Sequence, residues 1–179
     1  MMVIRLRTMV AAKPDFEMLA ETHSREIYYY LWRMLGNEQD AEDCLQDAFL
    51  RAYRAYERLN GDANTRAWLY KIATNTALTQ IRKRSQRENR TSATTLEQVS
   101  SGMNVGTQVE EKLSLKAVHS AVQALPHKQR AALMMRKYQE LSYAEIGRAL
   151  DSSEESARAN VYQALKKLRE QLAGELEEV

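Results

Sequence analysis

The stretch of sequence that decides the fold is SYAEIGRALDSSEESARANVYQALKK, residues 142–167. It starts with Ser142 and has Glu145 three residues later, which is the capping-box pattern that opens a helix. A tight polar turn at 151–153 separates this short helix from a longer one, whose apolar residues recur at helical spacing. A short helix, a polar turn and a longer helix are typical of a helix-turn-helix, although similar helix pairs also occur in plain bundles.

The longer helix carries polar and basic residues that suit duplex DNA. The N-terminal turns of a recognition helix meet base edges in the major groove, where Arg158 can pair with guanine and Asn160 with adenine. Basic residues further along such a helix suit phosphates. The candidate DNA-binding residues of this helix and its turn are Ser153, Glu155, Ser156, Arg158, Asn160, Gln163, Lys166 and Lys167.

Two more helices are predicted immediately before this motif. Apolar residues recur at helical spacing from Leu115 to Leu125, and Pro126 ends that helix. The same spacing predicts a second helix over about 127–138. The residues of these two helices that we expect to face inward are Leu115, Val118, Val122, Leu125, Ala131, Met134, Met135 and Tyr138.

Residues 91–110 have a different character. Nine of these twenty residues are Ser, Thr or Gly, and no helical stripe persists, which predicts a linker. As a flexible coil, a linker of this length spans about 25 Å on average. The two halves of the chain can then sit well apart on an extended partner.

The first half of the chain predicts three further helices that close a small core. They cover residues 15–35, about 40–56 and about 65–90. Gly36-Asn37 ends the first of them, and a polar loop at 60–64 precedes the third. Cys44 lies beside the apolar stripe of the second helix and is expected to be an inert buried thiol. That predicted stripe consists of Leu45, Ala48, Phe49, Ala52, Tyr53 and Tyr56.

The net charge of +2 hides two segments of opposite sign. Residues 37–50 carry five acids and neither Lys nor Arg, whereas residues 66–90 carry seven bases and a single acid. This pattern favours two different partners, although two solvated faces without a partner would show the same charges. The basic segment also mixes aromatic, amide and cationic side chains, which suits unstacked single strands as well as duplex phosphates. Within it, Trp68 is expected to belong to the core.

Composition excludes several other classes of protein. Apolar residues make up 44% of the chain, enough for packed cores, and only 6 Gly and 2 Pro argue against a turn-rich β-sandwich or barrel. One cysteine excludes an intramolecular disulfide framework and a thiolate-rich zinc site, and no apolar run approaches a membrane span. The three scattered histidines form no catalytic motif. We therefore expect an all-α, cytoplasmic, non-enzymatic protein without metal, cofactor or membrane insertion.

Three segments, in order, resemble bacterial RNA polymerase sigma factors. Residues 40–54, DAEDCLQDAFLRAYR, resemble their polymerase-binding helix, and residues 66–77, RAWLYKIATNTA, resemble their promoter-opening helix. Leu125-Pro126 together with LSYAEI at 141–146 resembles the entry to their second DNA-binding domain. The order and spacing are similar to the small extracytoplasmic-function (ECF) class, over roughly residues 15–90 and 111–175.

The resemblance implies two small helical domains joined by a flexible linker. A sigma2-like helical bundle would occupy residues 1–90, the linker residues 91–110, and a sigma4-like helix-turn-helix domain residues 111–179. The first domain would bind core RNA polymerase and would recognise and melt the −10 promoter element, and the second would read the −35 element as duplex. Family members are usually held inactive by an anti-sigma protein. The implied partners are therefore core RNA polymerase, promoter DNA and an anti-sigma factor.

The resemblance also implies roles for individual residues. Those implied to bind core polymerase are Asp40, Asp43, Gln46, Asp47 and Arg51. Those implied to bind the −10 element are Asn60, Asp62, Asn64, Thr65, Arg66, Lys71, Asn75, Gln80, Arg82, Lys83 and Arg84. The residues of the longer helix named above would bind the −35 element.

Two features depart from the family pattern, and two rival functions remain open. Asn64-Thr65 stands where many members have an aromatic residue, and the segment from Glu155 to Asn160 replaces a more basic recognition sequence, which predicts an unusual −35 preference. A free-standing helix-turn-helix repressor would bind duplex DNA without polymerase. The other rival is a decoy that only titrates polymerase or an anti-sigma factor. The basic helix argues against a decoy, because such a protein does not need to bind DNA.

Overall fold

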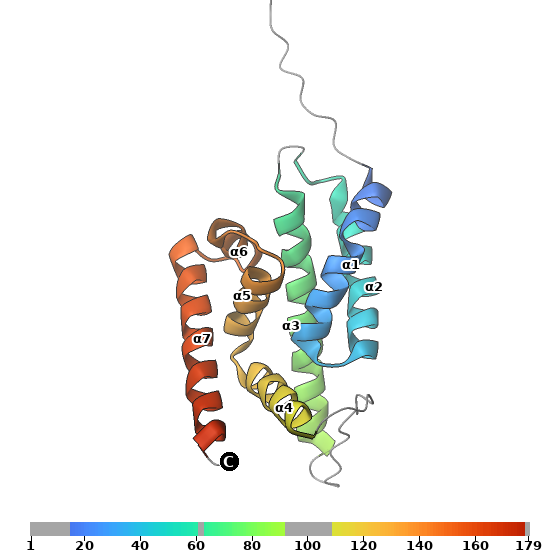
Figure 1. The fold of residues 1–179 in the computed structure, drawn as a ribbon. Helices are drawn as coiled ribbons and strands as arrows, with labels where there is room; N and C mark the ends of the chain where they lie inside the picture. Colours follow the sequence, from blue (N-terminus) through green and yellow to red (C-terminus); the bar gives the residue numbers. More distant parts are fainter. Residues whose placement is uncertain (1–14, 61–62, 92–108, 178–179) are drawn as a thin grey trace, which may run out of the picture.

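The computed structural model of the chain describes residues 15–60, 63–91 and 109–177. These residues form seven α-helices and no strand, which confirms the all-α prediction. Asp62 and nearly all of the predicted linker at 91–110 lie outside the described residues. The helices are α1 (Phe16–Leu35), α2 (Glu38–Tyr56), α3 (Thr65–Thr91), α4 (Val109–Ala124), α5 (His127–Tyr138), α6 (Tyr143–Ala149) and α7 (Glu154–Glu177) (Figure 1).

Helices α1, α2 and α3 pack around one another in a three-helix bundle. α1 ends at Gly36, whose left-handed backbone, with φ of 72°, lets its N–H donate back to the last turn of the helix. Asn37 then caps α2, because its side chain accepts a hydrogen bond from the N–H of Asp40. In the centre of the bundle, the fully buried hydroxyl of Tyr30 lies 2.7 Å from the hydroxyl of Thr74.

The buried face of α2 differs from the predicted stripe. Leu45 and Phe49 of the predicted stripe are half-buried and pack against the core, whereas Tyr53 is 59% exposed and was wrongly expected on the buried stripe. Small side chains let α2 approach its neighbours closely, which turns the larger side chains to the edge of the bundle. The residues that α2 buries are Ala41, Cys44, Ala48, Ala52 and Tyr56.

Cys44 behaves as the sequence predicts. Its side chain is buried against the bundle, and this burial raises the pKa of its thiol to about 12. A thiol with so high a pKa is almost wholly protonated near neutral pH and is therefore a poor nucleophile.

The helix-turn-helix of α6 and α7 follows local sequence rules. The predicted capping box is present, since Ser142 Oγ accepts from the N–H of Glu145 while the carboxylate of Glu145 accepts from the N–H of Ser142. Gly147 lies against the turn, and a Cβ at this position would be 2.8 Å from the carbonyl oxygen of Ser152. Asp151 turns the chain with a left-handed φ of 49°, which Asp tolerates better than most residues.

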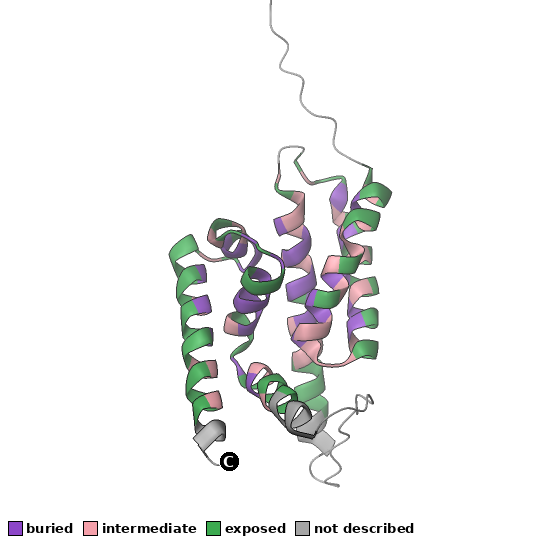
Figure 2. Cartoon of the chain, viewed as in Figure 1, coloured by how far each residue is buried: buried purple, intermediate pink, exposed green. Residues whose placement is uncertain are grey.

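The two groups of helices lie against each other. α6 packs on α3, and α5 packs on α1 (Figure 1). One hydrophobic core extends through both groups, and Figure 2 shows buried residues along α1, α2, α3, α5 and α6. The folded chain therefore brings the bundle and the helix-turn-helix into direct contact.

Several large side chains that were expected to face inward are exposed. They include Tyr138 on α5, which is 52% exposed. Tyr138 lies outside because Arg33 of α1 stacks over its ring, with the guanidinium carbon 4.1 Å from the ring centroid. On α4, Leu115 and Val118 are also exposed.

Candidate polymerase and nucleic-acid interfaces

A groove of about 540 Å³ runs between α2 and α3. Its α2 wall contains all five residues implied to bind polymerase, of which Asp43, Gln46, Asp47 and Arg51 are exposed and Asp40 is half-buried. The opposite wall is polar and basic. Its residues, all from α3, are Thr76, Thr79, Gln80, Lys83, Arg84 and Arg87.

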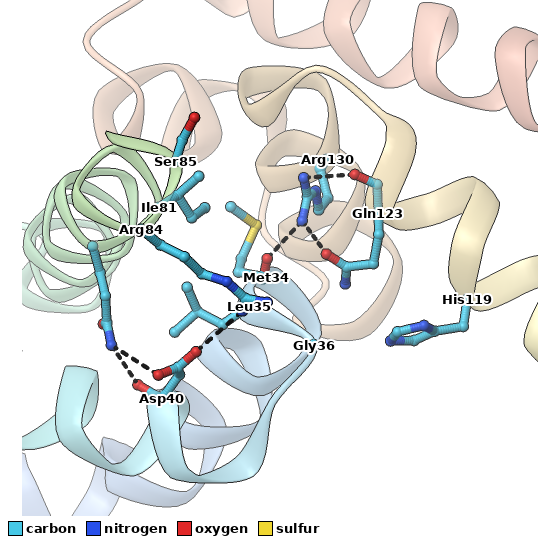
Figure 3. Close-up of a pocket in the computed structure, with 11 residues that line it drawn as sticks. Met34, Leu35, Gly36, Asp40, Ile81, Arg84, Ser85, His119, Gln123 and Arg130 are labelled. Atoms are coloured by element: carbon cyan, nitrogen blue, oxygen red, sulfur yellow. Dashed lines mark hydrogen bonds and ion pairs between the residues drawn. The ribbon is translucent and has the colours of Figure 1, made fainter. Parts of the chain in front are cut away.

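Asp40 links the two walls of this groove. Nη1 of Arg84 lies 3.4 Å from Oδ2 of Asp40, and Nε2 of Gln80 donates to the backbone carbonyl of Asp40 at 3.4 Å; Figure 3 shows Asp40 and Arg84 beside each other. Gln80, Lys83 and Arg84, which the resemblance implies to bind the −10 element, border the same groove as the residues implied to bind polymerase. Sequence reasoning also missed the exposed Leu50 on this groove.

Helical spacing could have revealed the α3 wall. Thr76, Thr79, Lys83 and Arg87 follow one another at intervals of three or four residues, which places them on one face of α3. This face is opposite the acidic residues of α2 across the groove. A search for a basic stripe facing the acidic helix would therefore have assigned these residues to the same surface.

The start of α3 and the residue before it carry further candidate −10 residues, and two of these, Asn64 and Lys71, contact the helix-turn-helix. Nδ2 of Asn64 donates to Oε1 of Glu145 at 2.9 Å, and its Oδ1 accepts from the N–H of Ala67, so Asn64 also caps α3. Nζ of Lys71 lies 2.6 Å from Oδ1 of Asp151. Of the remaining candidates, Thr65 is half-buried and Asn60, Asn75 and Arg82 are exposed.

Arg66 contacts the end of α5, just before the helix-turn-helix. Its guanidinium binds both carboxylate oxygens of Glu26 on α1, with Nη2 2.7 Å from Oε2, and Nη2 also donates to the carbonyl of Gln139 at 2.8 Å. The hydrogen bond to Glu26 raises the pKa of Arg66. Burial opposes ionisation of Glu26, but hydrogen bonds from Arg66 and His23 outweigh it and lower the pKa of that carboxyl. Arg66 is therefore a fixed cation between α1 and α5.

Glu145 is held in its ionised form. Hydrogen bonds from the Ser142 side chain, the Ser142 backbone and Asn64 lower the pKa of its carboxyl to about 2. The same carboxylate thus completes the capping box of α6 and accepts from the start of α3. A residue with an apparently local capping role also joins two distant segments of the chain.

A second set of contacts joins the end of α1 to the helices after the linker. Nη1 of the buried Arg130 donates to the carbonyl of Met34 at 2.7 Å, and Nη2 donates to the carbonyl of Gln123 at 2.8 Å. The amide of Gln123 donates in turn to the carbonyl of Arg33 at 3.1 Å. These donors satisfy carbonyls at the end of α1 that have no partner within the helix (Figure 3).

Burial lowers the pKa of Arg130. The cation lies beside a cavity of about 400 Å³ between the two groups of helices, which is lined by residues of α1, α2, α3 and α4 as well as by Arg130 (Figure 3). Sequence reasoning did not identify Arg130, because its partners among the described residues are carbonyl groups, an amide and the ring of His127, and none of them is acidic.

The candidate −35 surface lies on α7 and its preceding turn. Ser153 caps α7, since its Oγ accepts from the N–H of Ser156 at 3.1 Å. Arg158 lies over the ring of Tyr143 and 3.3 Å from Glu154. The candidates that are exposed are Ser153, Glu155, Ser156, Arg158, Gln163 and Lys166, and those that are half-buried are Asn160 and Lys167.

Neither a cluster of metal ligands nor a helix that could cross a membrane is present in the part of the chain that the structure describes. There, no group of three or more His, Cys, Asp or Glu side chains could hold a metal ion. No described helix has both the length and the apolar composition that crossing a membrane requires.

Family comparisons match both groups of helices. The model of Sigma-70 region 2 matches residues 19–87, and the model of Sigma-70 region 4 matches residues 115–168. A solved structure of the sigma factor RpoE in complex with the anti-sigma factor NepR from Bartonella quintana shares the fold, with a TM-score of 0.71, 21% identity, and coverage of 89% of this chain and 97% of that chain.

Curated relatives include ECF sigma factors. The sigma-E factor of Escherichia coli K12 is 31% identical over 136 residues, which cover 70% of each chain. SigW of Bacillus subtilis is 28% identical, with 96% of this chain and 97% of the relative covered. SigE of Mycolicibacterium smegmatis is 29% identical over 91% of this chain but only 63% of its own length. The chain belongs to the ECF family of RNA polymerase sigma factors, which direct the polymerase to promoters.

Proposed function

We propose that this chain binds core RNA polymerase through the α2–α3 groove, holds the −10 strand with the N-terminal half of α3, and reads the −35 element with α7. Residues 1–90 would act as the sigma2-like domain, 91–110 as the linker and 111–179 as the sigma4-like domain. The chain would work in the cytoplasm as an initiation factor rather than as an enzyme. An anti-sigma factor would keep it inactive until its promoters are needed.

The observation that carries this proposal is the exposed acidic wall of α2. Asp43, Gln46 and Asp47 lie within little more than one helical turn and border the same groove as Lys83 and Arg84. A rigid helix holds these side chains in a fixed pattern, and surface charges of this kind govern the rate and specificity of protein association. The exposed Leu50 adds apolar area at the same groove.

The DNA contacts are supported by the donors that α3 and α7 carry. Lys71 and Asn75 are one turn apart on α3, and a cation beside an amide suits the phosphates and exposed base edges of an unpaired strand. On α7, the exposed Arg158 lies in the N-terminal turns, where recognition helices meet base edges.

Strand opening distinguishes a sigma factor from a repressor. With core polymerase and a cognate promoter fragment, the chain should make −10 thymines reactive to permanganate, and the chain alone should not. Changing Lys71 and Asn75 to Ala should reduce this reactivity more than it reduces polymerase binding. Lys128→Ala, an exposed change on α5 outside every candidate surface, is the matched control. Tight binding of duplex by the chain alone, with no opening on addition of polymerase, would support the repressor instead.

A further inference from the structure

One aromatic ring of the helix-turn-helix lies against two arginine side chains. The guanidinium carbon of Arg158, on α7, is 4.7 Å from the centroid of the Tyr143 ring, and that of Arg136, on α5, is 4.8 Å from it. Both distances are within the range over which a cation is attracted to an aromatic ring. Arg136 also donates from Nη1 to the carbonyl of Leu141 at 3.1 Å. The ring thus brings side chains of α5, α6 and α7 together.

The position of the Tyr143 ring is fixed by its own helix and by the core. Tyr143 is the first residue of α6, and the capping box of Ser142 and Glu145 defines that helix start. The Tyr143 side chain is half-buried and packs against the hydrophobic core. The Arg158 side chain, which is 64% exposed, therefore lies against a ring that cannot move freely.

Arg158 is the one cationic side chain in the part of α7 that meets base edges. Between Glu154 and Leu165 the sequence has no other Lys or Arg, and Lys166 and Lys167 follow about two turns after Arg158. A bidentate arginine–guanine pair discriminates against other bases by roughly fivefold to more than a hundredfold. The base readout that a cation of α7 can supply therefore depends on where this guanidinium lies.

The two neighbours of Arg158 on the helix-turn-helix act on it differently. The carboxylate of Glu154 lies 3.3 Å from Nη2 and uses one of the N–H donors that a guanine would need. This ion pair joins two exposed side chains, and such pairs are weak and screened by salt. The ring of Tyr143 attracts the cation through its π electrons and requires no hydrogen bond from it. The ring can therefore hold Arg158 while its donors stay available to a base.

We infer that Tyr143 is a positioning residue for −35 recognition, which orders the guanidinium of Arg158 and thereby sets the preference for guanine at the base pair that Arg158 reads. This inference rests on the proposed function, because it concerns how the same α7 surface discriminates between bases. Tyr143 acts through Arg158. A side chain that is already ordered loses less conformational entropy when it binds, so the correct base gains more from the contact.

The test changes the ring and leaves the rest of the site in place. Tyr143→Phe keeps the ring, whereas Tyr143→Leu removes it and keeps an apolar side chain against the core. A trifluorinated phenylalanine in place of Tyr143 keeps the shape of the ring but removes most of the negative charge of its face, so it weakens the attraction without disturbing the packing. The matched control is Tyr138→Leu, which removes another exposed ring under an arginine, Arg33, outside the candidate −35 surface.

The first readout is the base preference of the holoenzyme at −35. Core polymerase with each chain selects from duplexes that carry random sequence at −35 and the −10 element of a cognate promoter, and sequencing of the bound fraction gives the preference at each base pair. The wild type should prefer guanine at one pair, and Arg158→Ala should lose that preference. At the same pair, Tyr143→Leu and the fluorinated ring should weaken the preference about two- to fivefold, the size of an exposed cation–π interaction. Tyr143→Phe and Tyr138→Leu should leave it unchanged.

Three results of the selection would overturn the inference. An equal loss of preference at every −35 pair would show that Tyr143 only stabilises the fold. An equal loss in Tyr143→Leu and Tyr143→Phe would assign the effect to the hydroxyl group, and no loss with either Leu or the fluorinated ring would show that the ring does not matter. A guanine preference that survives Arg158→Ala would leave Tyr143 with no base contact to position.

The second readout uses the free chain without DNA and so separates this inference from the proposed function. The Nε–H resonance of Arg158, assigned by its absence in Arg158→Ala, gives a ¹⁵N order parameter for the guanidinium. This order parameter should fall in Tyr143→Leu and stay unchanged in Tyr143→Phe and Tyr138→Leu. Equal order in all of these chains would overturn the inference. If the holoenzyme selected no −35 sequence, the proposed function would fail and the −35 role with it, while the order parameter would still decide whether the ring holds Arg158.

Discussion

The two functional surfaces of the first three helices differ in what covers them. The α2 wall of the polymerase groove is largely exposed, whereas at the start of α3 the side chains of Asn64, Arg66 and Lys71 contact the second group of helices. Both surfaces include residues of one helix, α3, whose C-terminal half borders the groove and whose N-terminal half meets α6. A single helix thus leaves one candidate surface open at its C-terminal half, while side chains at its start contact the second group of helices.

The difference has a physical basis in how each surface is satisfied. In the groove, Arg84 on α3 binds Asp40 on α2. This ion pair lies within the three-helix bundle and does not involve the helix-turn-helix. At the start of α3, the donors find acceptors that lie more than 70 residues away in the chain. Only the second surface therefore depends on how the two groups of helices are arranged.

The largest expected effect comes from breaking the buried contact between the groups. Arg130→Met keeps most of the side-chain volume but leaves the carbonyls of Met34 and Gln123 without their donor. The free energy of unfolding should fall by about 2–3 kcal/mol, as for other buried hydrogen bonds to a charged group. Urea denaturation followed by circular dichroism measures this change. Arg148→Met, at an exposed position on α6, should change it by less than about 0.5 kcal/mol.

The second largest effect is expected on polymerase affinity, from changes on the exposed α2 wall of the groove. The double change Gln46→Ala and Asp47→Lys removes an amide and reverses a charge on the exposed wall of α2. Affinity for core polymerase should fall by about thirtyfold, or ~2 kcal/mol, while helical content is unchanged. Biolayer interferometry with immobilised core enzyme measures the affinity, and Glu57→Lys, a charge reversal at the exposed end of α2, is the control. Full affinity in the folded double variant would remove the groove from the polymerase interface.

A smaller effect tests whether both surfaces share one scaffold. Tyr30→Phe removes a buried hydroxyl that bonds Thr74 in the centre of the bundle. Unfolding free energy should fall by about 1 kcal/mol, and the affinities for polymerase and oligonucleotide should stay within twofold of the wild type. Tyr162→Phe, at an exposed position, should have no measurable effect on stability. Selective loss of one of the two affinities would mean that the surfaces are not carried by a common core.

The smallest effect is a dependence on pH at the covered surface. The pKa of Glu145 is about 2 in the folded chain, below its ordinary value, so its ionised form favours the folded state above about pH 4.5, and this stability is lost as pH falls toward 2. Because the carboxylate is partly exposed, the contribution should stay under about 1 kcal/mol. The difference in unfolding free energy between wild type and Glu145→Gln should therefore shrink from pH 5 to pH 2.5. Ser142→Ala removes the hydroxyl hydrogen bond to the carboxylate, which is the largest cause of this lowered pKa, and should weaken the same pH dependence.

Local features of the fold could be predicted from the sequence. The capping box at Ser142, the helix end at Gly36 and the buried thiol of Cys44 follow from spacing and residue type, and all three are present. The acidic wall of α2 was also predictable, because the acidic residues implied to bind polymerase lie within two turns of one helix.

Other features could not be predicted because they depend on distant contacts. The exposure of Tyr53 follows from the close packing of an alanine face, which an apolar stripe does not reveal. The contacts of Asn64 with Glu145 and of Lys71 with Asp151 join residues about 80 positions apart, and no periodicity in the sequence records such pairs. Arg130 was missed because its partners are mostly backbone carbonyls, which every residue has.

The most direct test of the difference between the two surfaces compares the acetylation rates of Lys83, in the groove, and Lys71, paired with Asp151, by mass spectrometry. In the free chain, Lys83 should react several times faster than Lys71, which is paired with Asp151. Addition of core polymerase without DNA should reverse the order, protecting Lys83 and exposing Lys71. Equal reactivity of the two lysines in the free chain, or no change in Lys71 when polymerase binds, would contradict the account.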